Sequence, residues 1–231
     1  MRTRALLVGV LLLAASSANA QVPGTDVYVL RMRDGLLAQL SPPRNLTSRP
    51  GYDNQPAFVA EGAGLRYTSI DSTGQADIWF ADPEGGAPSR LTATETSEYS
   101  PTPIPGSDRF SVVQVEADST QRLWSFASAG SDPRLVLPEP AGVGYHAWGE
   151  AGELVLFVLG SPHELHRARA GEPGSMRVAR DIGRCLARSP GEGAWSFPLA
   201  DGEGGWNISR LDAATGEITS IAPTPDPVGE D

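Results

Sequence analysis

The chain has 231 residues, of which 40% are hydrophobic, and it contains 26 glycines and 20 prolines; its formal net charge is −10. All 18 basic residues are arginine, and an acidic chain without a concentrated basic patch does not suit nucleic acid or anionic membrane surfaces. The hydrophobic content is sufficient for a buried core, which excludes an intrinsically disordered chain, and the glycine and proline content predicts many turns.

Residues 1–20 have the organisation of a secretory signal peptide. Arg2 and Arg4 precede an apolar run from Ala5 to Ala15, and Ala18-Asn19-Ala20 provides the small residues that favour cleavage before Gln21. The apolar run is shorter than the roughly 20 residues that span a bilayer. No cysteine lies near the cleavage site, so we do not expect a lipid anchor. We expect a mature protein that is soluble in the periplasm or outside the cell.

After this segment, residues 26–47 predict two strands, and a similar pattern then recurs every 45 residues. Leu46 and Leu91 are separated by this interval, and so are Pro56 and Pro101. Each unit contains a glycine-rich turn, an apolar strand, a third strand with an aliphatic residue, a second turn and a fourth strand. We assign the units to residues 54–95, 99–138, 144–180 and 184–222.

Four short strands in about 40–45 residues is the period of a propeller blade. One blade buries only part of its apolar surface, and stacking against its neighbours buries the rest. The strand Leu154–Leu159 is apolar at every position, as expected where both faces of a sheet are covered. The pattern predicts an all-β β-propeller over residues 21–222, with four full blades, an N-terminal half blade at 26–47, and tryptophans that fill the space between blades (Trp79, Trp124, Trp148 and Trp195).

Several of these residues resemble the TolB-type propeller repeat, a family with WD-repeat-like blades. Asp77-Ile78-Trp79, Asp26-Val27-Tyr28 and the Leu-Thr pairs are similar to that family's Asp-Ile-Tyr strand and Leu-Thr blade end. The resemblance covers residues 26–222 and is closest in the first two full units. The family's Ser-Pro-Asp-Gly turn is altered in every copy, with Ser189–Glu192 the nearest, and its N-terminal α/β domain has no counterpart here. The resemblance implies a propeller fold.

The two ends of the repeat array do not match. The half blade at 26–47 has only a third and a fourth strand, and the tail 223–231 ends where another first strand would begin. We therefore expect an incomplete six-bladed ring from a truncated chain; a disordered C-terminal tail is the alternative. Truncation would expose two sheet edges, which natural proteins normally avoid.

Motifs for catalysis and metal binding are weak. The chain has no Gly-x-Ser-x-Gly nucleophile elbow. His163 and His166 lie three residues apart, which on a strand places them on opposite faces, so an exposed hairpin is favoured over a zinc site. The loop Asp71–Asp77 loosely resembles a calcium loop, but a turn also explains its residues. We expect no cofactor, with calcium as the alternative, and we expect the single cysteine, Cys185, to be a small buried side chain.

We therefore expect an exported, non-enzymatic binding scaffold with a protein or peptide partner and no nucleic-acid ligand. A metal-dependent lactonase or lyase of the propeller type and a non-functional truncated product are the alternatives. In propellers, the loops that enter the innermost strands line one mouth of the central channel, and tyrosines with polar neighbours make usable contact surfaces. The candidate contact residues at this mouth are Tyr52, Asp53, Asn54, Glu98, Tyr99, Tyr145, His146 and Arg184.

Overall fold

The computed structural model describes residues 24–224, except residues 34–35, 60–61, 190 and 192. The predicted signal peptide and most of the predicted tail lie outside these described residues. The described part contains no α-helix and no helix that could cross a membrane.

The described residues form four four-stranded antiparallel sheets, here called blades I to IV. Their strands are, in blade I, β5 (Tyr52–Phe58), β6 (Leu65–Ile70), β7 (Ala76–Ala81) and β8 (Ser89–Arg90); in blade II, β9 (Ser97–Pro103), β10 (Arg109–Val115), β11 (Gln121–Ala127) and β12 (Arg134–Leu137); in blade III, β13 (Val143–Trp148), β14 (Glu153–Val158), β15 (Glu164–Arg169) and β16 (Met176–Arg180); and in blade IV, β17 (Ala187–Ser189), β18 (Ala194–Ala200), β19 (Trp206–Asp212) and β20 (Ile218–Pro223).

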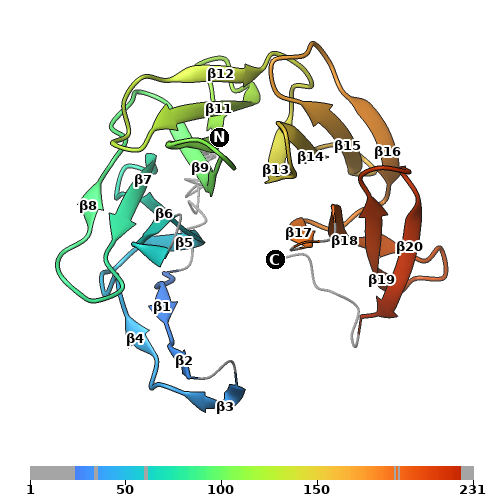
Figure 1. Ribbon diagram of the computed structural model, residues 1–231. Coiled ribbons are helices and arrows are strands. Elements are labelled where there is room, and N and C mark those ends of the chain that lie inside the picture. Colours follow the sequence, from blue (N-terminus) through green and yellow to red (C-terminus); the bar gives the residue numbers. More distant parts are fainter. Residues whose placement is uncertain (1–23, 34–35, 60–61, 190, 192, 225–231) are drawn as a thin grey trace, which may run out of the picture.

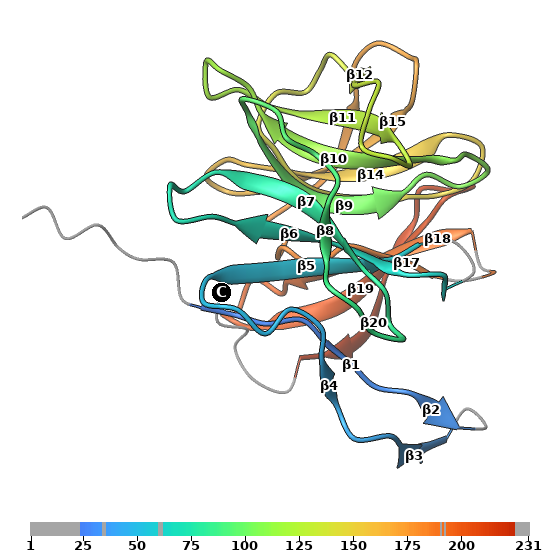
Figure 2. The ribbon, with the colours of Figure 1, turned by 90° about the vertical axis from the view of Figure 1, so that its left-hand side faces the viewer.

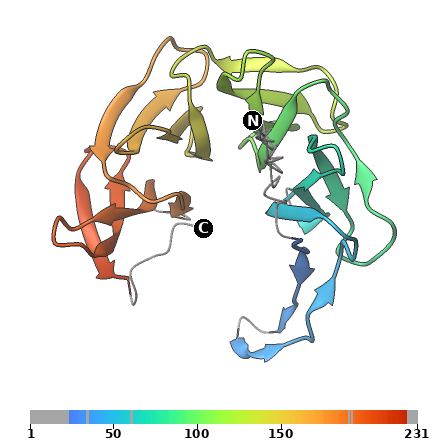
Figure 3. The same ribbon diagram turned by 180° about the vertical axis from the view of Figure 1, so that it is seen from behind.

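The four blades are arranged around a common axis. The first strands, β5, β9, β13 and β17, lie nearest the axis, and the fourth strands lie at the outside (Figure 1). The view from behind shows the same radial order (Figure 3), and the side view shows the blades stacked face to face (Figure 2). Each blade corresponds to one of the repeat units expected from the 45-residue period, so the predicted β-propeller of four-stranded blades is confirmed.

An N-terminal hairpin forms the expected half blade at one end of the arc. Its strands β1 (Tyr28–Val29) and β4 (Arg44–Asn45) pair with each other, as do β2 (Met32–Arg33) and β3 (Leu36–Leu40). Val27 and Leu46 pack on blade I in a cluster with Leu65 and Tyr67. Among the described strands, none of the half blade shares a sheet with β17–β20 at the other end of the arc (Figure 1).

Blade III shows why the blades stack. Alternate residues of β14 point to opposite faces of the sheet, and both faces are covered. Leu154 and Leu156 join an apolar cluster with blade II, whereas Val155 and Phe157 join a cluster with blade IV. All four side chains are fully buried. Each contributes about 1.5–3 kcal/mol relative to an exposed position, so the stacked faces dominate the stability of the fold.

Two of the predicted filler tryptophans are almost wholly enclosed between blades. Trp195 is 1% exposed and Trp148 is 4% exposed, whereas Trp79 and Trp124 are half-buried against neighbouring clusters. Close contact with Trp195 also explains why residue 149 is a glycine. A Cβ on Gly149 would lie 2.4 Å from Cζ2 of Trp195, and the bulky indole in a packed interface cannot retreat easily.

The substitution Gly149→Ala is therefore expected to lower the free energy of unfolding by about 1–3 kcal/mol, because the new methyl group overpacks the junction between blades III and IV. Denaturant unfolding followed by tryptophan fluorescence measures this change. Gly24→Ala is the matched control, since its Cβ would make only an ordinary contact of 3.5 Å with Gly51 O. Equal stability of the two variants would contradict the packing described for Trp195.

Candidate functional site

A pocket of about 430 Å³ lies where the inner strands of the blades meet. Blades I, II and III contribute to its lining, together with Arg184 from the segment that leads into blade IV, so the pocket exists only when the sheets are stacked. Four of the predicted contact residues are among the lining residues: Tyr52, Tyr99, Tyr145 and Arg184. We call this pocket the mouth pocket, and its remaining lining residues are Gln55, Ile70, Val113, Val115, Gln121, Gly144, Phe157 and Leu159.

The three tyrosines come from the inner strands of blades I, II and III. Tyr52 and Tyr99 do not occupy equivalent positions of the repeat, because the residue 45 positions before Tyr99 is Asn54. The inner strands are also irregular. The pairing of β5 with β6 shifts between Asn54 and Ala57, and comparable shifts occur in blades II and III. Gln55 and Ser100 have positive φ values of 55° at these irregularities. A β-bulge of this kind re-aims the side chains that follow it.

The tyrosine side chains converge in the mouth pocket. Burial raises the pKa of Tyr52 above its ordinary value; the hydrogen bond from Asn54 partly opposes this rise, and the nearby hydroxyls of Tyr145 and Tyr99 add to it. Asn54 Nδ2 donates a hydrogen bond to the Tyr52 hydroxyl at 3.0 Å, so Asn54 supports the pocket without being among its lining residues. The Tyr145 ring packs edge-on against Phe157, with a centroid distance of 5.7 Å. The site is thus an aromatic, partly apolar surface with several hydroxyl groups.

Asp53, Glu98 and His146 were also expected at the mouth, but the structure places them between blades. Side chains alternate along an inner strand, so the neighbours of the tyrosines turn toward an adjacent blade. Asp53 is 1% exposed and Glu98 is fully buried, while His146 is 6% exposed. None of the three lines the mouth pocket. Asp53 instead accepts a hydrogen bond from Arg49 Nη2 at 2.6 Å.

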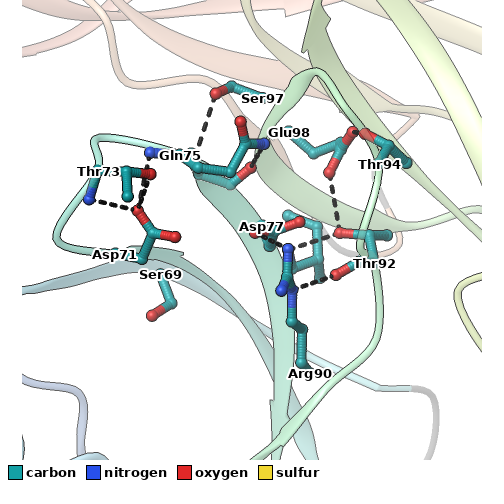
Figure 4. A network of polar contacts seen from close by, with 12 residues as sticks. Ser69, Asp71, Thr73, Gln75, Asp77, Arg90, Thr92, Thr94, Ser97 and Glu98 are labelled. Atoms are coloured by element: carbon teal, nitrogen blue, oxygen red, sulfur yellow. Dashed lines mark hydrogen bonds and ion pairs between the residues drawn. The ribbon is translucent and has the colours of Figure 1, made fainter.

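Glu98 belongs to a polar network that joins blades I and II (Figure 4). The Thr92 hydroxyl donates to Glu98 Oε2 at 2.9 Å, and Thr92 Oγ1 itself accepts from the backbone N–H of Ile78 at 2.8 Å. Thr94 also donates to the carboxyl group. Burial raises the pKa of Glu98, and the threonine hydrogen bonds only partly oppose this effect. The Leu-Thr motif therefore ends one blade and anchors the first strand of the next.

His146 is part of a second buried network, between blades II and III. Its Nε2 lies 2.6 Å from Ser111 Oγ, which also accepts a hydrogen bond from Trp148 Nε1 at 2.8 Å. A serine beside an imidazole is the arrangement of an activated nucleophile. Here Ser111 is fully buried, and its hydroxyl is already in contact with Trp148 and the carbonyl of Thr102. A substrate has no access to this oxygen, so the pair is structural.

Other motifs from the sequence also have structural roles. Asp71 Oδ1 accepts hydrogen bonds from the backbone N–H groups of Thr73 and Gln75, which is a turn function. Within the described residues, no group of three or more His, Cys, Asp or Glu side chains could hold a metal ion. Glu164 bonds His166 Nε2 at 3.0 Å. Cys185 is exposed, contrary to our expectation, because it lies before β17 rather than inside a sheet.

Several lining residues were not expected from the sequence. Gln55 sits at the irregularity of β5, and its side-chain orientation depends on a positive φ that no simple pattern reveals. Ile70 and Val115 lie at the ends of second strands, and Leu159 directly follows one. Their place in the repeat was a usable signal, since the end of a second strand adjoins the start of the first strand of the same blade.

The buried imidazole has a consequence for stability. Burial lowers the pKa of His146 from 6.5 to about 3, so the folded protein holds the ring neutral. At a pH between these two pKa values, the unfolded chain binds a proton at this residue and the folded chain does not. The free energy of unfolding therefore decreases as the pH falls through this range. Between pH 7 and pH 5 this group removes about 2 kcal/mol from the free energy of unfolding.

His146→Gln should abolish that component, measured as the difference between the unfolding free energies at pH 7 and at pH 5. His163→Gln in the same blade is the control, and an unchanged pH dependence in His146→Gln would refute the assignment.

Comparisons with known proteins bear on the fold. No family model matches the chain, and no curated protein matches it. Among solved structures, TolB from Acinetobacter baumannii is similar with a TM-score of 0.66 and 13% identity, over 79% of this chain and 46% of that one. A putative TolB from Agrobacterium tumefaciens is similar with a TM-score of 0.63 and 14% identity, over 85% of this chain and 78% of that one.

A puromycin-hydrolyzing peptidase from Mycobacterium tuberculosis is similar with a TM-score of 0.61 and 12% identity, over 80% of this chain and 32% of that one. The chain thus spans less than half of the Acinetobacter protein and about a third of the peptidase. Identities this low report on the fold alone. The described part of the chain therefore has a TolB-like β-propeller fold, with four complete blades and an N-terminal half blade.

Proposed function

We propose that the protein is an exported, non-enzymatic scaffold that binds a protein or peptide partner at the mouth pocket. The observation that carries the proposal is the convergence of Tyr52, Tyr99 and Tyr145 from three blades on one pocket. Tyrosine is enriched among the residues that dominate binding energy, because it combines a large apolar ring with a hydroxyl group.

The location and the solved structures provide further support. Residues 1–20 have the features of a signal peptide, which suits a periplasmic or secreted protein. TolB proteins share the fold, as does a peptidase, so the comparisons leave catalysis open. We favour binding without catalysis because the Ser111–His146 pair is enclosed between blades, whereas the exposed pocket is lined mainly by apolar, tyrosine and amide side chains.

Tyr99→Ala is expected to weaken partner retention by about tenfold or more, because it removes one of the three aromatic side chains that converge on the pocket. Tyr99 also packs against the cluster between blades II and III, so denaturant unfolding of the variant checks that it is folded under the conditions of capture. Affinity capture from the exported protein fraction of the native cell, with quantitative mass spectrometry, measures retention on the wild type and on the variant. Tyr28→Ala is the matched control, since Tyr28 is 55% exposed and lies on the half blade, away from the pocket. Retention that is equal on wild type and Tyr99→Ala would count against the mouth pocket as the binding surface.

A further inference from the structure

The mouth pocket carries one charge, and that charge is positive. Arg184 is the only side chain that is charged at neutral pH among the twelve described lining residues; the others are tyrosines, glutamines, a glycine and apolar residues. The protein as a whole has a net charge of −10, so the sign of the pocket is opposite to that of the molecule. An exposed cation in a partly apolar recess attracts anionic groups more strongly than one on an open surface.

Arg184 is also not neutralised by a partner. Within the described residues, no hydrogen bond or ion pair involves its guanidinium group, and it is exposed. Nearby arginines behave differently: Arg188 pairs with Glu150 at 2.7 Å, and Arg122 pairs with Glu116. Arg184 is therefore available to a ligand, whereas these arginines are already engaged within the protein.

The backbone around Arg184 is fixed, which positions the side chain. Ile182 is fully buried and pairs with Leu199 of β18, and the N–H of Gly183 donates to Pro198 O at 2.9 Å. A Cβ on Gly183 would lie 2.9 Å from the Pro198 ring, so this segment is packed tightly against blade IV. The guanidinium group thus extends from an anchored chain toward the pocket that Arg184 lines.

The polar groups around the pocket are rich in hydrogen-bond donors. Gln55 Oε1 accepts hydrogen bonds from the Thr68 hydroxyl at 2.9 Å and from Ser100 N–H at 3.0 Å, which leaves the Gln55 amide nitrogen for a ligand. In the described part of the chain, the hydroxyls of Tyr99 and Tyr145 make no hydrogen bond. A cation, an amide nitrogen and free hydroxyls match a ligand that only accepts hydrogen bonds, and an ionised carboxylate is such a group.

We propose that the mouth pocket selects peptides that carry a carboxylate, which Arg184 binds, next to an apolar or aromatic residue that packs on Tyr145 and Phe157. The inference rests on the proposed function and adds the chemistry of the ligand. Arginine and a carboxylate form charge-assisted, often bidentate hydrogen bonds, so the contact confers specificity as well as affinity. The carboxylate comes either from an acidic side chain or from the C-terminus of the peptide.

Two libraries of short random peptides test the proposal, one with free C-terminal carboxylates and one with amidated C-termini. Each library is selected on the full wild-type chain and on Tyr99→Ala, and the enriched peptides are resynthesised with Asp or Glu replaced by Asn or Gln. Fluorescence anisotropy then gives their dissociation constants. Removal of the essential carboxylate is expected to weaken binding by about tenfold or more, and added salt should weaken the acidic peptides selectively. Preference for the free-carboxylate library identifies the C-terminus as the source, and enrichment of Asp or Glu in both libraries identifies the side chain.

Arg184→Gln should remove the discrimination between acidic and neutral peptides, while Arg188→Gln, at an arginine of the same blade that is paired with Glu150, should retain it. The Asp→Asn and Glu→Gln substitutions are made in the peptides and their binding is measured on the wild-type protein, so this result does not depend on the folding of any variant. If peptides that are enriched on the wild-type protein relative to the Tyr99→Ala variant bind equally well without their carboxylate, this inference is overturned and the proposed function stays intact. The absence of any peptide enriched over Tyr99→Ala would overturn the proposed function itself.

Discussion

The structure depends on one constraint: a sheet inside the arc has two apolar faces, and only neighbouring sheets can cover both. β14 shows this directly, since Leu154 and Leu156 pack toward blade II while Val155 and Phe157 pack toward blade IV. The chain has one cysteine and therefore no intramolecular disulfide, so the burial of these faces has to hold the blades together. Radial stacking covers the apolar faces at the junctions between successive blades, with apolar clusters at the I–II, II–III and III–IV junctions.

The same stacking creates the candidate site. It brings four inner strands to one axis, and the alternation of side chains then separates two kinds of residue. Tyr99 faces the mouth pocket, whereas its neighbour Glu98 enters the junction with blade I and binds Thr92 there. The polar junction and the pocket are therefore two faces of one strand. This relation explains why acidic residues accompany the tyrosines in the sequence although the pocket itself contains none.

The fold was largely predictable from the sequence, and the site only in part. The 45-residue period and the uniformly apolar run at β14 specify stacked four-stranded blades because both reflect regular backbone geometry. The pocket residues depend on local irregularities instead. Gln55 and Ser100 adopt positive φ values that shift the register of the inner strands, and no composition rule signals them. The exposure of Cys185 was missed for a similar reason, since a strand-like run of residues lies in a connecting segment. Arg184 was identified by its position, but its lack of an acidic partner depends on the tertiary structure.

Hydrogen–deuterium exchange of the wild-type chain tests the central claim most directly. If stacked blades shield both faces of β14, the amides of Leu154–Val158 will exchange only through global unfolding, and their protection will equal the free energy of unfolding measured with denaturant. The amides of the outer strand β16 will exchange faster, through local opening. Exchange of β14 as fast as that of β16 would contradict the account, because it would show that the sheet is not enclosed by its neighbours.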